Sequence, residues 1–204
     1  MAGVSRADRR GQIVEAALTV FADKGYHPAG VADIIQQTGI ARGTFYLYFT
    51  GKRAVFDAVV DEIFQRILEQ LHPVKVPDPW DEQAVIDQVR GNAERLARLM
   101  LANPRSVRVL FGEAAGLDRE ASARLSGFYD RLGHWVGESL QEGIRLGIVR
   151  PCDTLVTAHA LIGALRGMLW AWAVGLLPLD EATLVEETLR LTREGVLRTR
   201  DRPA

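Results

Sequence analysis

The chain has 204 residues, of which 48% are hydrophobic and 25% are charged, and its formal net charge is −1 at pH 7. This length allows one large domain, or a small domain joined to a larger one, with enough apolar side chains for a proper core. A single cysteine, Cys152, excludes an internal disulfide. No secretory segment opens the chain, and no uninterrupted apolar run approaches the roughly 20 residues of a membrane span. We therefore expect a soluble, cytoplasmic protein.

The charge is distributed unevenly along the chain. Residues 1–55 carry seven basic and four acidic side chains, a net charge of +3, so the remainder carries −4. A polyanion would therefore dock at the N-terminal end. The excess is small, and many solvated helices have a similar one, so this indication needs support from motifs.

The first part of the chain predicts three helices. Residues 6–24 have the apolar spacing of an amphipathic helix, which Gly25 ends. Two short helices are expected at 31–39 and 41–49, joined by a tight turn that carries Gly39. This is the helix-turn-helix arrangement, whose second helix can enter the major groove of DNA.

The rest of the chain also predicts helices. A wide apolar stripe indicates a helix at 52–71, and three prolines make residues 72–79 a loop. No period-2 alternation is long enough for a strand, so the expected fold class is all-α. Further helices are expected near 80–101, 104–114, 118–147, 152–175 and 180–198, separated by Pro104, Gly116, the turn at 147–151 and Pro178.

Two segments carry a family resemblance. GQIVEAALTVFADKGY at residues 11–26 and VADIIQQTGIARGTFYLYFTGKRAVF at 31–56 resemble, in order and spacing, the TetR family of bacterial transcriptional regulators. The resemblance implies a three-helix DNA-binding domain at residues 1–51 and a helical domain at 52–204 that dimerises and binds a small-molecule effector. It implies a homodimer on a palindromic double-stranded DNA operator, with repression as the usual outcome. No cofactor, metal, membrane contact or catalytic residue is expected.

Two positions depart from the family pattern. Ala29 and Gly30 stand where members usually open the second helix with hydroxyl residues that touch phosphate, and Ile35 stands where a small residue is usual. Hydroxyl contacts therefore cannot be carried over, although the backbone N–H groups of Gly30 and Val31 could still meet a phosphate.

Residues 41–49 predict which side of the second short helix meets DNA. If Phe45 and Phe49 face the core, Gly43 and Leu47 point away from it, with Thr44 and Tyr46 on either side. Tyr48 and Lys52 resemble the phosphate contacts of the family. An alternative is that all four aromatic residues of this stretch belong to a core. The predicted DNA-binding residues are Arg42, Gly43, Thr44, Tyr46, Leu47, Tyr48 and Lys52.

Small residues at four-residue steps in 152–175 predict a surface where another helix can approach closely. The resemblance favours an interface between subunits made by the last two helices, and packing inside one subunit is the alternative. The predicted interface residues are Gly163, Gly167, Ala171, Gly175, Val185, Leu189 and Val196.

The effector pocket is less clearly indicated by the sequence. Arg166, in an apolar helix, needs either an internal carboxylate, a surface position or an anionic ligand. An apolar pocket with a cationic mouth would suit a fatty or aromatic acid or its coenzyme A thioester. The predicted lining residues are Phe64, Leu68, Met100, Phe111, Trp135, Arg166 and Trp170.

Two other classes of protein share single features with the sequence. Glu69 and His72 form one E-x-x-H motif, but a di-iron helical bundle needs a second E-x-x-H and two further glutamates, and the chain has no second motif. A helical interaction protein that has lost DNA binding is the other alternative. Arg42, Thr44 and Tyr46 argue against it.

Overall fold

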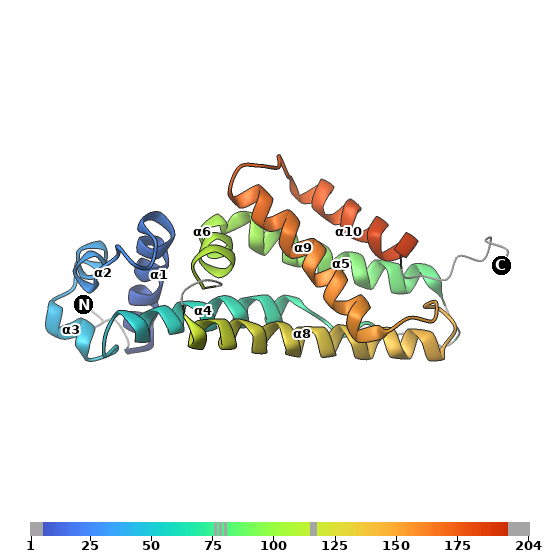
Figure 1. The fold of residues 1–204 in the computed structure, drawn as a ribbon, viewed down its shortest axis with the longest axis horizontal. Coiled ribbons are helices and arrows are strands. Elements are labelled where there is room, and N and C mark those ends of the chain that lie inside the picture. Colours follow the sequence, from blue (N-terminus) through green and yellow to red (C-terminus); the bar gives the residue numbers. More distant parts are fainter. Residues whose placement is uncertain (1–5, 76, 78, 80, 115–117, 196–204) are drawn as a thin grey trace. The chain divides into compact units, whose positions relative to one another are not determined.

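A computed structural model describes residues 6–75, 77, 79, 81–114 and 118–195, without the side chains of Glu82 and Glu113. These residues form helices and contain no strand, which confirms the all-α class (Figure 1). The helices are α1 (Arg6–Lys24), α2 (Val31–Thr38), α3 (Arg42–Tyr46), α4 (Lys52–Gln70), α5 (Glu82–Ala102), α6 (Pro104–Arg108), the π-helical turn η1 (Val109–Glu113), α8 (Arg119–Arg145), α9 (Thr154–Ala173) and α10 (Glu181–Gly195).

The chain divides into two compact units. The first comprises residues 1–66 and 103–125, and the second comprises 67–102 and 126–204. The domain boundary between residues 51 and 52 stays a prediction. Helix α4 begins at Lys52, and most of it belongs to the first unit. Two helices, α4 and α8, contribute residues to both units.

Aromatic rings form much of the core of the first unit. Phe21 of α1 and Phe56 of α4 are fully buried and meet edge to face, with ring centroids 5.2 Å apart. Phe45 and Phe49 are 0% and 5% exposed, so the predicted inward face of the second short helix is confirmed. Their burial fixes which side of α3 remains at the surface.

The helix boundaries differ from the expected ones at two places. α3 ends at Tyr46, three residues earlier than expected, because the Leu47 N–H donates to the Thr44 carbonyl in a tightened last turn. The single helix expected at 104–114 is α6 followed by η1. The expected separator at Gly116 lies outside the described residues.

Two glycines permit features that a side chain would oppose. Gly39 ends α2 with φ of 68°, in the left-handed region, and its N–H donates to Ile35, so the predicted turn between α2 and α3 is confirmed. Gly133 of α8 lies against His159 of α9, where an added Cβ would come within 2.4 Å of the imidazole. This close approach brings α8 and α9 together in the second unit.

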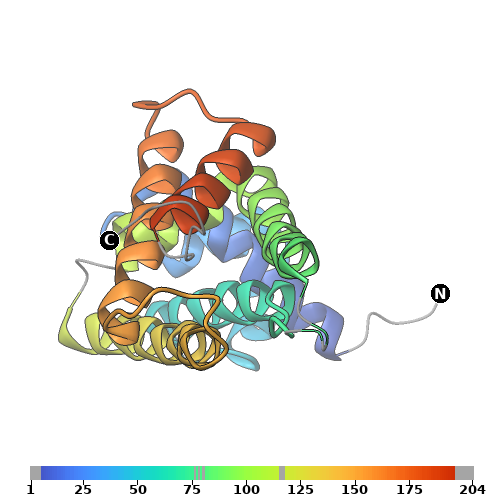
Figure 2. The same cartoon turned by 90° about the vertical axis from the view of Figure 1, so that its right-hand side faces the viewer.

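In the second unit α10 lies alongside α5 (Figure 2). Val185 and Leu189 are the buried side of this pairing, and the Arg90–Glu186 and Arg98–Glu181 ion pairs flank it. On α9, in contrast, only Ala158 and Leu169 of the 20 residues are buried.

Candidate nucleic-acid interface and effector cavity

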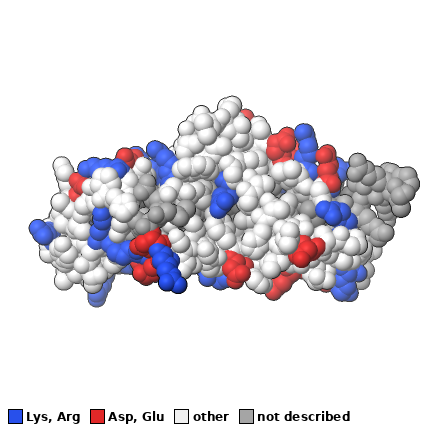
Figure 3. Space-filling view, in the orientation of Figure 1, with Lys and Arg blue, Asp and Glu red and all other residues white. Residues whose placement is uncertain are grey.

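The outer side of α3 presents polar and apolar groups together. Leu47 and Tyr46 are 73% and 46% exposed, and Arg42 is exposed beside them. The Arg42 guanidinium lies 5.8 Å from the centroid of the Tyr46 ring, and the Phe45 ring meets Tyr46 edge to face from the core side. These contacts orient Arg42 and Tyr46 at the surface, where they can reach base edges or phosphates. Basic side chains are visible at this end of the first unit in Figure 3.

The remaining predicted DNA contacts occupy intermediate positions. Gly43 is exposed, whereas Thr44 and Tyr48 are half-buried. Added bulk at Gly43 would meet nothing within 4 Å in the chain, so its backbone is open to close approach. Their roles in DNA binding stay predictions.

The side chain of Lys52 forms its hydrogen bonds within the chain. Its ammonium donates to the carbonyl oxygens of Tyr26, His27 and Ala29 at 2.9, 3.1 and 2.9 Å, and it lies 4.4 Å from the Tyr26 ring centroid. An ammonium has three donors, so binding a phosphate would require giving up one of these bonds. The family-based phosphate role is therefore not supported by this conformation, in which Lys52 fixes the turn before α2.

The start of α2 also differs from the expectation. The N–H of Gly30 donates to Asp33 at 2.9 Å, and Lys24 donates to the other oxygen of the same carboxylate at 2.8 Å. These two hydrogen bonds, the Lys24 one foremost, lower the pKa of Asp33. Gly30 is thus not free to meet a phosphate, and a carboxylate occupies the helix end where one would bind.

An ion-pair cluster lies in the first unit and was not predicted. Arg53 pairs with Asp57 of its own helix and with Asp118 and Glu120 at the start of α8. Arg124 of α8 pairs in turn with Asp57. Its members come from two segments about 65 positions apart in sequence, so residue spacing could not predict the cluster. The cluster fastens the beginning of α4 to the beginning of α8.

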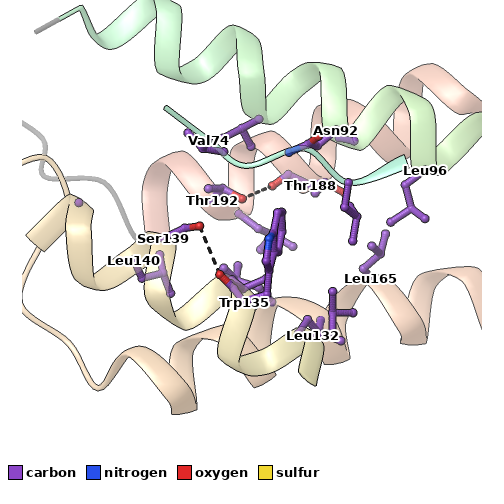
Figure 4. A pocket seen from close by; sticks show the side chains of 18 of the residues that line it. Val74, Asn92, Leu96, Leu132, Trp135, Ser139, Leu140, Leu165, Thr188 and Thr192 are labelled. Atoms are coloured by element: carbon purple, nitrogen blue, oxygen red, sulfur yellow. Dashed lines mark hydrogen bonds between the residues drawn. The ribbon is translucent and has the colours of Figure 1, made fainter. Parts of the chain in front are cut away.

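The second unit contains a cavity of about 250 Å³ (Figure 4). Its walls come from α5, α8, α9 and α10, and side chains such as Leu96, Leu140 and Leu165 make it strongly apolar. Of the predicted lining residues, Trp135 lines this cavity. The other six do not: Met100 is buried elsewhere, Leu68, Trp170 and Arg166 are exposed, and Phe64 and Phe111 belong to the first unit.

A segment at residues 71–75, which we name the strap, closes one side of the cavity. Leu71 and Val74 line the cavity, while backbone groups of the strap are held by amide side chains of α5. Asn92 bonds both the N–H and the carbonyl of His72, and Gln88 bonds both groups of Lys75. Arg95, one turn beyond Asn92, donates to the carbonyl of Gln70 at 2.9 Å. Three side chains on one face of α5 thus fix the end of α4 and the strap. Because α4 ends at Gln70, Glu69 and His72 do not share a helix.

The guanidinium of Arg166 has a partner other than a carboxylate. It lies over the ring of Tyr129, 5.6 Å from the centroid. The Tyr129 hydroxyl is buried without a well-formed hydrogen bond to the described residues. Burial raises the pKa of Tyr129 to about 12, against the opposing influence of Arg166.

The outer face of α9 is apolar and open. Gly163, Gly167 and Gly175 are exposed, with nothing within 4 Å of an added Cβ, and Ala171 is half-buried. Residues 174–179 of the loop after α9 carry no charged side chain, and the top of the molecule in Figure 3 is largely white. By length and composition α9 could cross a membrane, although His159 and Arg166 interrupt its apolar sequence. An exposed apolar helix face of this kind is also typical of a helix that packs against another subunit.

The α10 part of the predicted interface is different. Val185 and Leu189 are buried on the side of α10 that packs on α5, so they belong to packing inside one subunit. Their 4-residue spacing is equally suited to either packing, which is why the sequence could not distinguish the two. Val196 lies outside the described residues.

Comparison with known proteins gives the family. The model described as "Bacterial regulatory proteins, tetR family" matches residues 13–59. YdgC of Bacillus subtilis (strain 168), described as an uncharacterized HTH-type transcriptional regulator, is 32% identical over 194 residues, which cover 93% of each chain. YvdT of the same organism, with the same description, is 38% identical over 60 residues, 29% of this chain and 31% of that protein. The chain belongs to the tetR family of bacterial regulatory proteins.

A solved structure supports the fold over nearly the whole chain. FadR from Bacillus subtilis, in complex with stearoyl-CoA, has a TM-score of 0.74 at 22% sequence identity, with 89% of this chain and 96% of that chain covered. The likeness extends beyond the matched N-terminal segment. It therefore shows the same fold in the second unit.

Proposed function

We propose that the chain is a homodimeric repressor that binds a two-fold symmetric DNA operator and is released by an effector in the cavity of the second unit. The exposed group of Arg42, Tyr46 and Leu47, anchored by the buried rings of Phe45 and Phe49, is the observation that carries the DNA-binding part. We propose no enzymatic activity, since the relatives named above are transcriptional regulators.

The dimer follows from the size of α3. A helix of five residues presents few base contacts, so a specific operator requires a second copy about 34 Å away on the same face of the duplex. The outer face of α9 supports this assembly, because Gly163 and Gly167 let a partner helix approach closely and Trp170 and Val174 offer exposed apolar area.

The cavity favours an effector with an aliphatic chain. Leucines and valines make up much of its wall, and FadR, which binds stearoyl-CoA, has the same fold. A fatty or aromatic acid, or its coenzyme A thioester, is therefore the effector class that we propose. The apolar wall selects for the hydrocarbon part by burial alone.

The strap supplies a physical link from effector to DNA. An effector that touches Leu71 and Val74 changes the contacts of the segment in which α4 ends. At its other end α4 begins with Lys52, whose three hydrogen bonds hold the turn before α2. A shift of α4 along this route would alter how α2 and α3 are presented.

The experiment measures operator affinity of the full chain with and without palmitoyl-CoA. An operator is first selected from random duplex DNA, and Tyr46→Ala serves as the DNA-binding control. We expect palmitoyl-CoA to weaken binding roughly 5- to 150-fold, and the operator to weaken palmitoyl-CoA binding by the same factor. Unchanged operator affinity at saturating palmitoyl-CoA would refute an acyl effector, and tighter binding would refute release by it.

A further inference from the structure

The polar side chains around the cavity are largely occupied. The hydroxyls of Thr188 and Thr192 donate to the carbonyls one turn earlier, at 2.7 and 2.9 Å, and Ser139 donates to Trp135 O at 3.3 Å. Asn92 is engaged with His72 of the strap. The three hydroxyls therefore have no donor left for a ligand without breaking a bond inside the protein, whereas the Asn92 amide keeps one N–H beyond its bond to His72.

The indole of Trp135 differs from the lining hydroxyls. Its N–H has no hydrogen-bond acceptor among the described residues, and the ring is half-buried. Figure 4 shows the ring rising from α8 into the cavity, toward the side where Thr188 lies. An indole N–H donates and does not accept, so it selects for a ligand atom with a lone pair.

The described wall of the cavity offers no positive charge to an anion. Among the residues that the structure describes, no lysine, arginine or histidine lines the cavity, and the charged residue that does is Glu142, which pairs with Arg145. A carboxylate moved into this wall would lose its hydration without gaining a cation, which costs far more than moving a neutral carbonyl. The lack of a cation in the described wall thus disfavours a carboxylate relative to a neutral carbonyl group.

We infer that the cavity recognises an acyl chain that ends in an uncharged ester or thioester group, whose carbonyl oxygen accepts a hydrogen bond from the Trp135 indole. The inference rests on the proposed function and narrows its effector class, because a free fatty acid ionised at neutral pH is disfavoured. Trp135 is then a specificity-determining residue, while the leucines and valines bind the chain without discriminating between head groups.

The test uses the full-length protein at pH 8 and three probes of similar length: methyl decanoate, decanoate and undecane. Binding is followed by displacement of Nile red, a neutral apolar dye. We expect methyl decanoate to bind at least about 10-fold more tightly than decanoate. Trp135→Phe, which keeps most of the ring volume, should weaken methyl decanoate roughly 3- to 10-fold and leave undecane unchanged. Trp172→Phe is the matched control, since Trp172 does not line the cavity.

A second measurement does not depend on a variant. The infrared carbonyl stretch of bound methyl decanoate, isotopically labelled at C1, should shift to lower frequency than in alkane solvent, as expected for a hydrogen-bonded carbonyl. Decanoate binding as tightly as the ester, or an unshifted carbonyl stretch, would overturn the inference and leave the proposed function intact. If none of the three probes displaces Nile red, the cavity is not an acyl site, and both this inference and the proposed acyl effector fail.

Discussion

The side-chain amide of Asn92 binds both backbone polar groups of His72: it accepts from the N–H at 2.9 Å and donates to the carbonyl at 2.8 Å. Gln88, one turn earlier on α5, repeats the arrangement with Lys75 at 2.8 and 2.7 Å. Two amides on one helix face thus hold an extended segment as a neighbouring strand would. The strap is a wall of the cavity and the continuation of α4, so its attachment bears on both stability and regulation.

Replacing Asn92 by alanine removes both bonds to His72. We expect Asn92→Ala to lower the free energy of unfolding by about 1–2 kcal/mol, with a fall in Tm of about 2–6 °C. It should also reduce the factor by which effector weakens operator binding, because strap and α5 then move independently. Thermal unfolding and operator titration measure the two effects.

Gln83→Ala is the control for that variant. Gln83 is an exposed amide on α5 whose side chain bonds Asp87 of the same helix and does not touch the strap. It should change neither the Tm by more than about 1 °C nor the effector response. If Gln83→Ala and Asn92→Ala behave alike, the strap has no special role.

Lys52→Met tests whether this lysine is structural. The change keeps the aliphatic stem and removes the charged donor of three hydrogen bonds, so we expect a loss of about 2–4 kcal/mol in unfolding free energy. Because the ammonium is already engaged, the salt dependence of operator affinity should change less than in Arg42→Ala, where the slope should fall by about one. If the slope of the salt dependence falls as much in Lys52→Met as in Arg42→Ala, Lys52 contacts a DNA phosphate and this prediction is wrong.

The sequence predicts local features well and long-range ones poorly. The boundaries of α1, the turn at Gly39 and the burial of Phe45 and Phe49 follow from periodicity and turn chemistry, which depend on neighbouring residues. The strap does not, because an amide in α5 gives no sign of the backbone it will bind some 13–20 positions away. Val185 and Leu189 show the same limit: their spacing predicts a packed face without naming the partner helix.

Gly167→Leu tests the proposed subunit interface. A leucine on the open face of α9 meets nothing in its own chain, but it would separate two helices that approach closely through glycine. We expect the variant to be a folded monomer at low micromolar concentration, by sedimentation, where the wild type is a dimer. Gly11→Leu, another exposed helical glycine with open space around it, should leave the dimer unchanged. If the Gly167→Leu variant is still a dimer, the subunit interface does not lie on this face of α9.

Tyr129 should make stability depend on pH in the alkaline range. Its pKa is about 12 in the folded chain and about 10 in the unfolded chain, so the unfolded state loses the proton first as pH rises. The free energy of unfolding should be unaffected by this group below pH 10 and should fall between about pH 10 and 12, by roughly 2–3 kcal/mol.

Tyr129→Phe should remove this pH dependence. The variant should be as stable as the wild type at pH 7, because the lost hydroxyl is buried without a good partner, and relatively more stable at pH 11. Denaturant unfolding at the two pH values measures the difference. Parallel loss of stability in both proteins would mean that Tyr129 is not the titrating group.

The central claim, that the α3 face reads DNA sequence in a dimer, is tested most directly by selection from random duplex DNA at about 150 mM salt. The selection is run on wild type, Tyr46→Phe and Tyr46→Ala. We predict a two-fold symmetric site for the wild type and a loss of about 1–3 kcal/mol in its binding for Tyr46→Ala at unchanged Tm, with Tyr46→Phe separating the hydroxyl from the ring. An identical site with equal affinity in all three proteins would contradict the assigned face, and an enriched site without two-fold symmetry would contradict the dimer.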